Sequence, residues 1–569
     1  MRANSSRWLA LLLIALAAGA IVAPMLFLGN VSGHDTTFHL ASWFGAASQW
    51  RQGVAYPRWA QWPNWGFGEP RFIFYPPASW MLGAALGSIL PWKMVPGAFV
   101  WLVLWFAGWA MWRLAREALP NSQAIAAAIL FVVSPYQLVV VYYRGDFAEL
   151  VAGSLFPLLL LGVFSVVTGE ARQMWKNVSL LAIVFAAIWL SNAPAAVIAT
   201  YSTALMLAAG CIVRRSFYPL FPGGSAMALG FGLAAFYILP AAYEQRWVQI
   251  AQVVEGSFNL RQNFLFTHSS DPEFALFNWK VSCVALGIML LASIAGVFSA
   301  RRRREYPALW GMLVPLALAS VFLMLPISLL LWRYLPELRF LQFPWRWLVA
   351  LDVPYAFFLA SAISPSGRRW VWYGALLVML ACAATVMIRD AWWDTGDIPI
   401  LEAAIRTGHG SEGTEEYTPL GCDRSAIPGF IAEPDSEEIF DQTPSTPLVE
   451  RFDPDSEQLL PLQGSEVSVE KWFAEEKDLR VETAEPVTLA LRLLNYPAWE
   501  ARIDGVPSPI SSQAETGRML VLVPAGQHRV KIRFRRTRDR AAGAAISALS
   551  AVLLLGCMAL TGRQTRRSL

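Results

Sequence analysis

Long apolar segments recur along this sequence, and each of them is long enough to cross a membrane as an α-helix. Such a helix needs about 20 mostly apolar residues. Segments that meet this condition lie at 8–29, 97–115, 122–142, 147–168, 177–193, 194–213, 218–240, 276–299, 306–331, 346–363, 369–388 and 541–561. Only 15% of the residues are charged, which excludes a soluble enzyme, a disordered protein and a secreted disulfide scaffold. We therefore expect a membrane all-α helix bundle with about 12 transmembrane helices.

The basic residues indicate how this bundle is oriented. The segment 76–91 is apolar but short, and if it does not cross, one face of the membrane collects most Arg and Lys clusters. That face would carry the basic residues at 2, 7, 113, 116, 172, 176, 214, 215, 301–304, 368, 369, 563, 566 and 567. Positive charge marks the cytoplasmic face, so we expect both termini there. One basic run is an exception, because it would lie on the outer side of the last helix: Arg535, Arg536, Arg538 and Arg540.

A soluble region interrupts the apolar pattern before the last helix. The segment from Asp390 to Asp478 holds 22 of the 41 acidic residues, whereas only 13 precede position 390. The first half of the region is rich in Pro, Ser, Glu and Asp, so we expect irregular structure there. The second half alternates as strands do, in VSVEKW (467–472), VTLALRLL (487–494), MLVLVPAG (519–526) and RVKIRF (529–534). A small β-sandwich-like domain is therefore predicted between the last two helices.

Three regions follow from these patterns. A polytopic membrane module covers 1–388 and has a large first periplasmic loop at 30–95. A periplasmic soluble domain covers 389–540 and is β-rich over 466–536, and 541–569 forms the last transmembrane helix and a cytoplasmic tail. The five cysteines give no disulfide or metal pattern, and P-loop, Rossmann and G-x-S-x-G motifs are absent. The net charge of +4 averages a basic membrane part with an acidic soluble part, so it does not imply nucleic-acid binding.

The first candidate site residues follow the first apolar segment, in GHDTTFHL (33–40). An acid beside lipid is costly and is a functional candidate for that reason. If a helix starts here, Asp35 and His39 are four residues apart and share one face of it. The pair is suited to removing a proton or to binding a metal. The alternative is that Asp35 only caps the helix, since Asp favours that position.

A second charged group, YYRGDFAE (142–149), would reach the same membrane face as Asp35. Arg144 has the planar fork of donors that binds a phosphate, while Asp146 or Glu149 serves a metal or a hydroxyl. The alternative is a surface ion pair, which contributes little. Because the membrane part contains so few acids, two acidic groups on one face favour a site over this alternative.

Aromatic residues accompany both groups. The first loop is rich in Trp, Tyr and Phe, and about half of these are expected to anchor the loop at the membrane interface. The remainder could stack on sugar rings or polyprenyl chains. A later segment, QFPWRW (342–347), places Arg346 among aromatics at a helix start. This Arg is either another interfacial anchor or a second phosphate clamp.

Together these motifs resemble a known family. GHDTTFHL (33–40), GVAYPRW (53–59), GFGEPRFIFYPP (66–77) and YYRGDFAE (142–149) are similar to bacterial multi-spanning membrane proteins of the YfhO-like group, described as 6-pyruvoyl-tetrahydropterin synthase related. The same pattern continues in QFPWRW (342–347), EEYTP (415–419), NYPAWEARIDG (495–505) and VPAGQHRVKIRF (523–534). The resemblance covers nearly the whole chain and is most specific in the first loop. The pterin label implies no pterin chemistry here, because the chain has no His-rich zinc set.

The resemblance implies a GT-C glycosyltransferase fold with the active site in the first external loop. It places the catalytic acid of the family at Asp35, and we expect His39, on the same helix face, to act with it. The residues expected to bind substrate are Arg144, Asp146, Glu149, Arg346, Arg58 and Glu69. A divalent metal, Mg or Mn, would be held by Asp35 and Asp146. Better-studied GT-C enzymes have a second acid beside the one that Asp35 matches, and this sequence has His34 there instead.

The function so implied is sugar transfer from a polyprenyl-phosphate-linked donor to a periplasmic or cell-envelope glycan or glycolipid, in a bacterial inner membrane. The expected partners are these substrates and membrane lipids, without nucleic acid. Two other classes stay open: a flippase or transporter of lipid-linked saccharides, and a non-catalytic envelope assembly scaffold. A transporter should carry polar residues along a path inside its helices, whereas most polar candidates here gather on one face. A scaffold would not need Asp35 or Asp146.

Overall fold

The computed structural model describes residues 2–300, 304–363, 369–394, 396–428, 446–462 and 465–566. Its helices are α1 (Arg2–Leu28), α2 (Thr36–Arg51), α3 (Arg71–Phe74), α4 (Pro77–Gly87), α5 (Val95–Ala115), α6 (Asn121–Val132), α7 (Pro135–Leu138), α8 (Phe147–Thr168), α9 (Met174–Trp189), α10 (Ala193–Arg214), α11 (Leu220–Leu233), α12 (Ala235–Glu244), α13 (Pro272–Ser299), α14 (Pro307–Leu323), α15 (Leu329–Tyr334), α16 (Leu348–Ala362), α17 (Arg369–Asp390), α18 (Asp397–Thr407) and α19 (Arg538–Arg566). Residues 301–303, 368 and 567 of the predicted basic clusters, and 567–569 of the predicted tail, lie outside this description.

The predicted membrane helix bundle is confirmed, and the number of crossings stays a prediction. Within the described residues, eight helices are long and apolar enough to cross a membrane, and ten do so if each of two bent pairs counts as one span. The bent pairs are α11 with α12 and α14 with α15. The other two predicted crossings, 177–193 and 346–363, correspond to the shorter helices α9 and α16. The segment 76–91 forms the 11-residue helix α4, which is too short to span.

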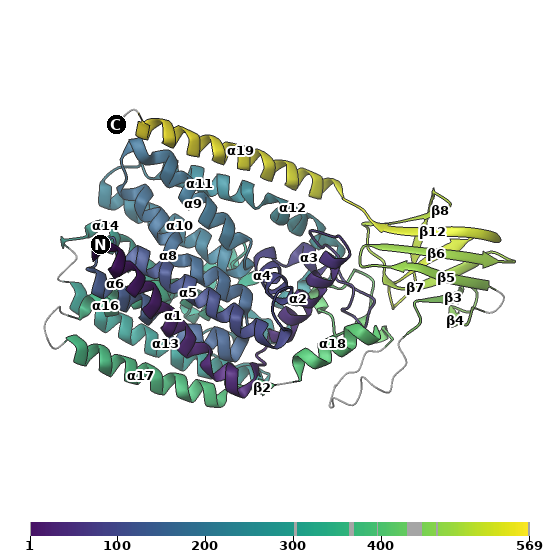
Figure 1. The fold of residues 1–569 in the computed structure, drawn as a ribbon, viewed down its shortest axis with the longest axis horizontal. Helices are drawn as coiled ribbons and strands as arrows, with labels where there is room; N and C mark the ends of the chain where they lie inside the picture. Colours follow the sequence, from purple (N-terminus) through teal and green to yellow (C-terminus); the bar gives the residue numbers. More distant parts are fainter. Residues whose placement is uncertain are drawn as a thin grey trace.

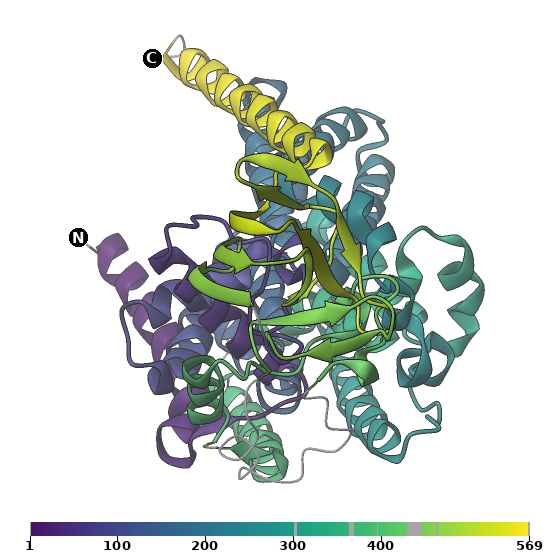
Figure 2. The ribbon, with the colours of Figure 1, turned by 90° about the vertical axis from the view of Figure 1, so that its right-hand side faces the viewer.

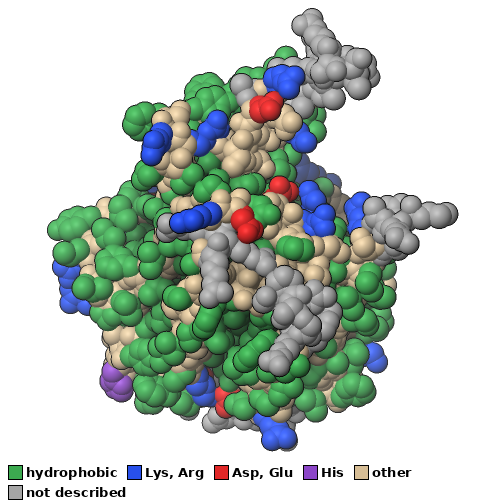
Figure 3. Space-filling model, turned by 90° about the vertical axis from the view of Figure 1, so that its left-hand side faces the viewer, with side chains coloured by type: hydrophobic (Ala, Val, Ile, Leu, Met, Phe, Trp, Pro, Cys, Tyr) green, Lys and Arg blue, Asp and Glu red, His purple; other side chains and the backbone are tan. Residues whose placement is uncertain are grey.

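The bundle packs around one large apolar core that extends from α1 to α18. Its helices run roughly along the long axis of the molecule, and both termini lie at the end away from the strands (Figure 1). Seen from that end, Lys and Arg side chains are more abundant than Asp and Glu (Figure 3). Cytoplasmic loops commonly carry such an excess of Lys and Arg, and the side of the membrane on which this end lies stays a prediction.

The strands form a β-rich region near the C-terminus, as predicted, but it begins earlier than residue 466, because β3 and β4 precede that position. Besides the short β1 (Asn30–Val31) and β2 (Trp393–Asp394), they are β3 (Val449–Asp453), β4 (Gln458–Leu460), β5 (Ser465–Trp472), β6 (Glu476–Thr483), β7 (Val487–Leu494), β8 (Trp499–Ile503), β9 (Val506–Ser508), β10 (Ile510–Ser512), β11 (Arg518–Val523) and β12 (Gly526–Phe534). One sheet has the order β10-β11-β7-β3-β4 and the other β5-β6-β12-β8-β9. Their inward residues, such as Leu489 and Val530, share one core, so the two sheets form a sandwich.

The sandwich is closely joined to the bundle and covers the centre of its end (Figure 2). Trp59 of the first loop contacts Trp499 at 5.4 Å between ring centroids and belongs to the apolar core of the sandwich. On another side, Arg540 at the start of α19 binds Glu244 at the end of α12, and Tyr496 donates to the same carboxylate at 2.7 Å. The first loop, 30–95, therefore packs between the helix bundle and the sandwich.

The expectation of irregular structure in the first half of the soluble region is partly wrong. This half contains α18, and β2 within it pairs antiparallel with β1, directly after α1. The amphipathic spacing of Ile398, Leu401 and Ala404 explains the helix, because all three are buried on one face. Residues 429–445 of the same half lie outside the described residues.

Candidate active site

The chain around Arg144 owes its path to Pro and Gly. Pro135 separates α6 from α7, and the Ser134 side chain caps α7 by accepting from the Tyr136 amide at 3.2 Å. A π-helical turn, Val139–Arg144, follows and ends at Gly145, whose φ is +63°. A Cβ on Gly145 would overlap the Thr36 hydroxyl. Only Gly therefore allows the first loop to pack this closely.

Backbone contacts fix the first loop against the Arg144 turn. The Asp35 amide donates to the Arg144 carbonyl at 2.8 Å. Asp35 occupies the N-cap of α2, yet its side chain makes no capping hydrogen bond. Its carboxylate instead accepts from Arg144, with Nε at 3.2 Å from Oδ2 and Nη2 closer still. The Asp35 side chain is therefore not a helix cap, and its role in a site stays a prediction.

Arg144 binds three carboxylates. The sequence predicted only that they lie on the same face of the membrane. Besides binding Asp35, Arg144 places its Nη2 3.0 Å from Asp146 Oδ2 and its Nη1 3.4 Å from Glu149 Oε2. Asp146 also caps α8, since its Oδ1 accepts from the Glu149 amide at 2.8 Å. Arg144 is only 4% exposed, so the group is not the surface ion pair considered from the sequence.

Arg346 joins the same cluster from the turn before α16. Its Nε lies 3.3 Å from Glu149 Oε2, and its Nη2 lies 3.8 Å from Asp146 Oδ2. Only Nη1 has clear hydrogen bonds, to the Leu341 carbonyl and to Gln342 Oε1. The Nε atom is buried, and its orientation toward Glu149 does not give a hydrogen bond. Arg346 therefore keeps donor capacity for a further acceptor.

His39 lies on the inner side of the cluster. Its Nε2 is 3.5 Å from Asp146 Oδ1 and equally far from the Tyr75 hydroxyl. Its Nδ1 is 3.5 Å from Ser79 Oγ. His39 is fully buried, so it contacts Asp146 rather than solvent. The predicted pair thus divides, with His39 inside and Asp35 at the surface.

The charges of the cluster are unequal in exposure. The Asp35 side chain is 37% exposed, whereas those of Asp146 and Glu149 are at most 3% exposed. Burial alone would raise the pKa of Asp146, but Arg144, His39 and Arg346 outweigh it and hold that pKa well below its ordinary value. Asp35 is thus the carboxylate that a substrate from outside can reach.

Two predicted substrate-binding residues lie elsewhere. Glu69 is buried in a separate group, 2.6 Å from Arg71 Nε, and accepts from Thr414 of the soluble region. The Arg58 guanidinium lies over the Tyr56 ring, and its backbone amide donates to Glu475 of the sandwich. Both residues therefore join the first loop to the C-terminal domain, outside the Arg144 cluster.

Sequence reasoning missed Tyr136 and gave Tyr75 no role in a cluster. Tyr136 donates to Glu149 Oε1, and Tyr75 lies beside His39. Tyr136 follows a Ser-Pro pair in an otherwise apolar segment, and this break in the helix was the available signal.

The residues present do not by themselves fit a metal ion. The two predicted ligands, Asp35 and Asp146, both bind Arg144. Across the described part of the chain, no group of three or more His, Cys, Asp or Glu could hold a metal. Use of Mg or Mn stays a prediction.

Fold and cluster together define a multi-pass membrane protein with a buried, charged site at the end of the bundle that faces a β-sandwich. The chain belongs to the family described as "6-pyruvoyl-tetrahydropterin synthase related domain; membrane protein", which it matches over residues 72–395. The family resemblance seen in the sequence is confirmed. Arg144, Asp146, Glu149 and Arg346 lie within the matched range, and Asp35 precedes it.

Solved structures give a weaker likeness. The arabinofuranosyltransferase AftD from Mycobacteria is 18% identical, with a TM-score of 0.43, and the match covers 69% of this chain and 27% of that chain. The Archaeoglobus fulgidus oligosaccharyltransferase in complex with Zn and sulfate is 13% identical, with a TM-score of 0.41. The match covers 72% of this chain and 58% of that chain. The chain thus spans less than two thirds of either protein. No curated protein matches the sequence.

Proposed function

We propose that this protein is a membrane glycosyltransferase that moves a sugar from a polyprenyl-phosphate-linked donor to a glycan or glycolipid acceptor of the cell envelope. The observation that carries the proposal is the half-exposed carboxylate of Asp35, held by a buried Arg at the membrane end of the first external loop. Both contacts with Arg144 use Oδ2. Oδ1 forms no hydrogen bond with a described residue and can take a proton.

In the proposed reaction, Asp35 is the general base. The acceptor hydroxyl attacks the anomeric carbon of the donor sugar and gives its proton to Oδ1 of Asp35. The bond between that carbon and the phosphate oxygen breaks, and its electron pair leaves with the polyprenyl phosphate. A positioned base typically contributes 10²- to 10⁴-fold to such a step. Arg144 orients the carboxylate through its two contacts with Oδ2.

Arg346 is the better phosphate ligand of the two predicted arginines. Arg144 directs its guanidinium to three carboxylates, so it has little left for a substrate. Arg346 Nε lies 3.3 Å from Glu149 without a hydrogen bond, and its Nη2 lies 3.8 Å from Asp146, so neither donor forms a hydrogen bond with a carboxylate. A leaving phosphate placed beside it would gain stabilisation as its charge grows. In this assignment Asp146 and Glu149 hold the two arginines in place.

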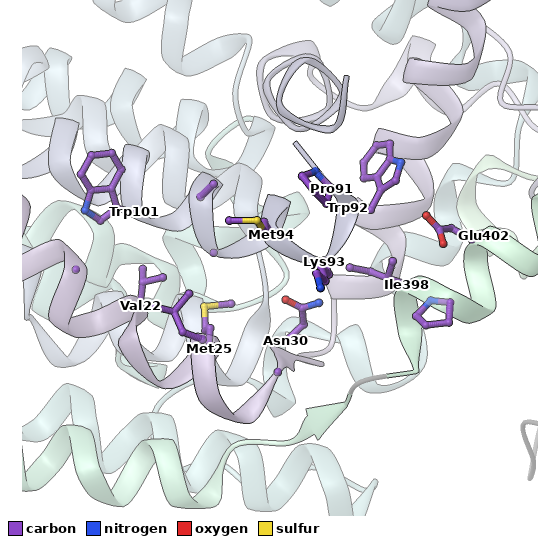
Figure 4. A pocket seen from close by; sticks show the side chains of 16 residues that line it. Val22, Met25, Asn30, Pro91, Trp92, Lys93, Met94, Trp101, Ile398 and Glu402 are labelled. Carbon is purple, nitrogen blue, oxygen red and sulfur yellow. The ribbon is translucent and has the colours of Figure 1, made fainter. Parts of the chain in front are cut away.

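A mostly apolar cavity of about 910 Å³, whose lining also includes Lys93 and Glu402, supports a lipid-linked donor. It lies between the end of α1, the start of α5 and α18, and its lining includes Val22, Met25 and Trp101 (Figure 4). Leu26 and Met94 on its wall are more than half exposed, so it opens toward the outside of the bundle. We assign it to the prenyl chain of the donor, because an isoprenoid would bury apolar surface there.

We assign acceptor binding to the sandwich and to the segment that precedes it. Tyr417 stacks on Phe74 of the first loop at 5.5 Å, directly before Tyr75, which in turn contacts His39. An acceptor bound between the two domains would reach Asp35 from the end of the bundle opposite the basic face. This arrangement corresponds to an active face in the periplasm of a bacterial inner membrane.

The test is a transfer assay with the purified, full-length protein in detergent. A panel of radiolabelled polyprenyl-phosphate sugars is supplied with an envelope extract as acceptor. Protein-dependent appearance of label in the glycan or glycolipid fraction, from at least one donor, is the expected result. Movement of the same lipids across vesicles, without any transfer, would instead assign the chain to transport and overturn the proposal.

A further inference from the structure

The basic run before the last helix is not explained by the proposed reaction. It breaks the charge rule that the other clusters follow, because it lies at the end of α19 nearest the sandwich (Figure 1). Two of its members, and Arg533 just before it, are neutralised by carboxylates of the protein. Arg533 binds Glu476 at 2.9 Å, Arg535 binds Glu500, and Arg540 binds the buried Glu244 at 2.6 Å.

Two arginines of the run remain without a carboxylate. Arg536 and Arg538 are exposed and form no ion pair with a described residue. The acid of the same segment, Asp539, is turned toward Glu244 and is half-buried. The positive charges of Arg536 and Arg538 are therefore exposed and are not neutralised by a described carboxylate.

A third exposed arginine comes to the same level from α12. The pair between Glu244 and Arg540 joins the end of α12 to the start of α19, and Arg246 follows Glu244 by two residues. The Arg246 guanidinium lies 3.8 Å from the centroid of the Tyr243 ring and 5.4 Å from that of Trp247. Arg246 is exposed and has no carboxylate partner among the described residues.

Both helices start or end a candidate membrane span at this level. One span ends at Trp247 and the other begins at Arg538. Tyr243, which is 43% exposed, supplies the amphipathic ring that favours the headgroup layer of a bilayer. The surface thus combines three unpaired guanidinium groups, an interfacial aromatic and the edge of two apolar helices.

We propose that Arg246, Arg536 and Arg538 form a headgroup site for anionic phospholipid at the membrane surface between α12 and α19. The phosphate of the lipid would accept from the guanidinium groups, while its acyl chains would lie along the two helices. The site holds the linker between the sandwich and α19 at the bilayer surface. It does not depend on the proposed function, since none of the three residues belongs to the Asp35 cluster.

Lipid titration of the full-length protein in detergent, with bound lipids counted by native mass spectrometry, tests this site. The probes are phosphatidylglycerol and the zwitterionic phosphatidylcholine. Wild type should bind phosphatidylglycerol more tightly than phosphatidylcholine. The triple variant Arg246→Gln, Arg536→Gln, Arg538→Gln should lose about 5-fold in phosphatidylglycerol affinity per arginine, which corresponds to about 1 kcal/mol each.

Two further variants make the test specific. The matched control removes three exposed arginines elsewhere, Arg261→Gln, Arg333→Gln and Arg339→Gln, and should keep the wild-type preference. Replacing the three site residues by Lys keeps the charge and should keep most of the preference, which excludes misfolding as the cause of the loss. Equal affinities in wild type and the Gln variant, or an equal loss in the control, would overturn the proposal. A third outcome would also overturn the proposal. If wild type shows no preference for phosphatidylglycerol but binds soluble polyglutamate, and the Gln variant loses that binding, the site binds a soluble polyanion.

Discussion

The Nε atom of Arg346 lies 3.3 Å from a carboxylate oxygen of Glu149, which joins the turn before α16 to the first turn of α8 inside the bundle. Glu149 also binds Arg144 and accepts from Tyr136. The turn before α16, the π-helical turn Val139–Arg144 and α7 therefore all contact α8 at one buried carboxylate. Its removal leaves two buried guanidinium groups short of negative charge.

Glu149→Gln is expected to destabilise the protein by about 3 to 5 kcal/mol, the usual effect of breaking a buried ion pair. Thermal unfolding in detergent measures it. The control is Glu170→Gln, which breaks an ion pair with Arg172 whose side chains are 70% and 78% exposed. That change should cost less than about 1 kcal/mol. Equal effects of the two variants would show that the Arg144 cluster is not a structural centre.

Gly145→Ala is expected to displace the first loop. The added Cβ would overlap Thr36 Oγ1, and the φ of +63° disfavours Ala. A loss of about 1 to 3 kcal/mol in stability should accompany a loss of transfer activity. Gly224→Ala in α11 is the control, because a Cβ there meets nothing within 4 Å. Normal activity of Gly145→Ala would mean that the contact between loop and turn is not needed.

Glu416 should make stability depend on pH. Burial, reinforced by Glu69, raises the pKa of Glu416 to about 7 from an ordinary 4.5. The folded protein thus holds this proton more tightly than the unfolded chain does. The resulting stability is present below about pH 4.5 and is lost as the pH rises through about 7.

Glu416→Gln should remove this loss, so that unfolding temperatures measured from pH 4.5 to pH 7 fall less steeply than those of wild type. Glu466→Gln, at an exposed position of β5, should leave the wild-type profile unchanged. A variant profile parallel to that of wild type would contradict the assignment of the proton to Glu416.

Filling the apolar cavity should discriminate between donors by chain length. Gly97 lines the cavity, and Gly97→Phe would project into it near Val22. We expect a raised KM for long-chain polyprenyl donors and an unchanged KM for short-chain analogues. Gly287→Phe on α13 is the control, since a Cβ there meets nothing within 4 Å. Equal KM changes for both chain lengths would show that the prenyl chain binds elsewhere.

The sequence indicated the helix bundle, the β-rich region and the residues of the cluster because each rests on a local signal. Apolar runs identify helices, alternation identifies strands, and an acid in a stretch this poor in charge is conspicuous. Asp35 and Arg144 lie far apart in sequence, and the sequence predicted their contact only in part. The topology placed both on one membrane face, but only the packing of Gly145 on Thr36 brings them together.

Other features depend on tertiary contacts that no local pattern reports. Glu69 and Arg58 lie in first-loop motifs that carry the family resemblance, as Asp35 does. Their partners, Thr414 and Glu475, come from the soluble region. Tyr136 donates a hydrogen bond to Glu149 because the short helix that starts at Pro135 directs its side chain toward that carboxylate. The helix α18 escaped notice because its few apolar positions lie in a segment dominated by turn-forming residues.

The most direct test of the account is the rate of sugar transfer by Asp35→Asn beside that by Asp271→Asn. Both residues occupy helix N-caps, but only Asp271 caps through its side chain, a role that Asn can fill. With equal expression, Asp35→Asn should lower the rate by at least about 100-fold, the loss expected for a general base. Asp271→Asn should transfer at close to the wild-type rate. Undiminished transfer by Asp35→Asn would contradict the catalytic role of Asp35.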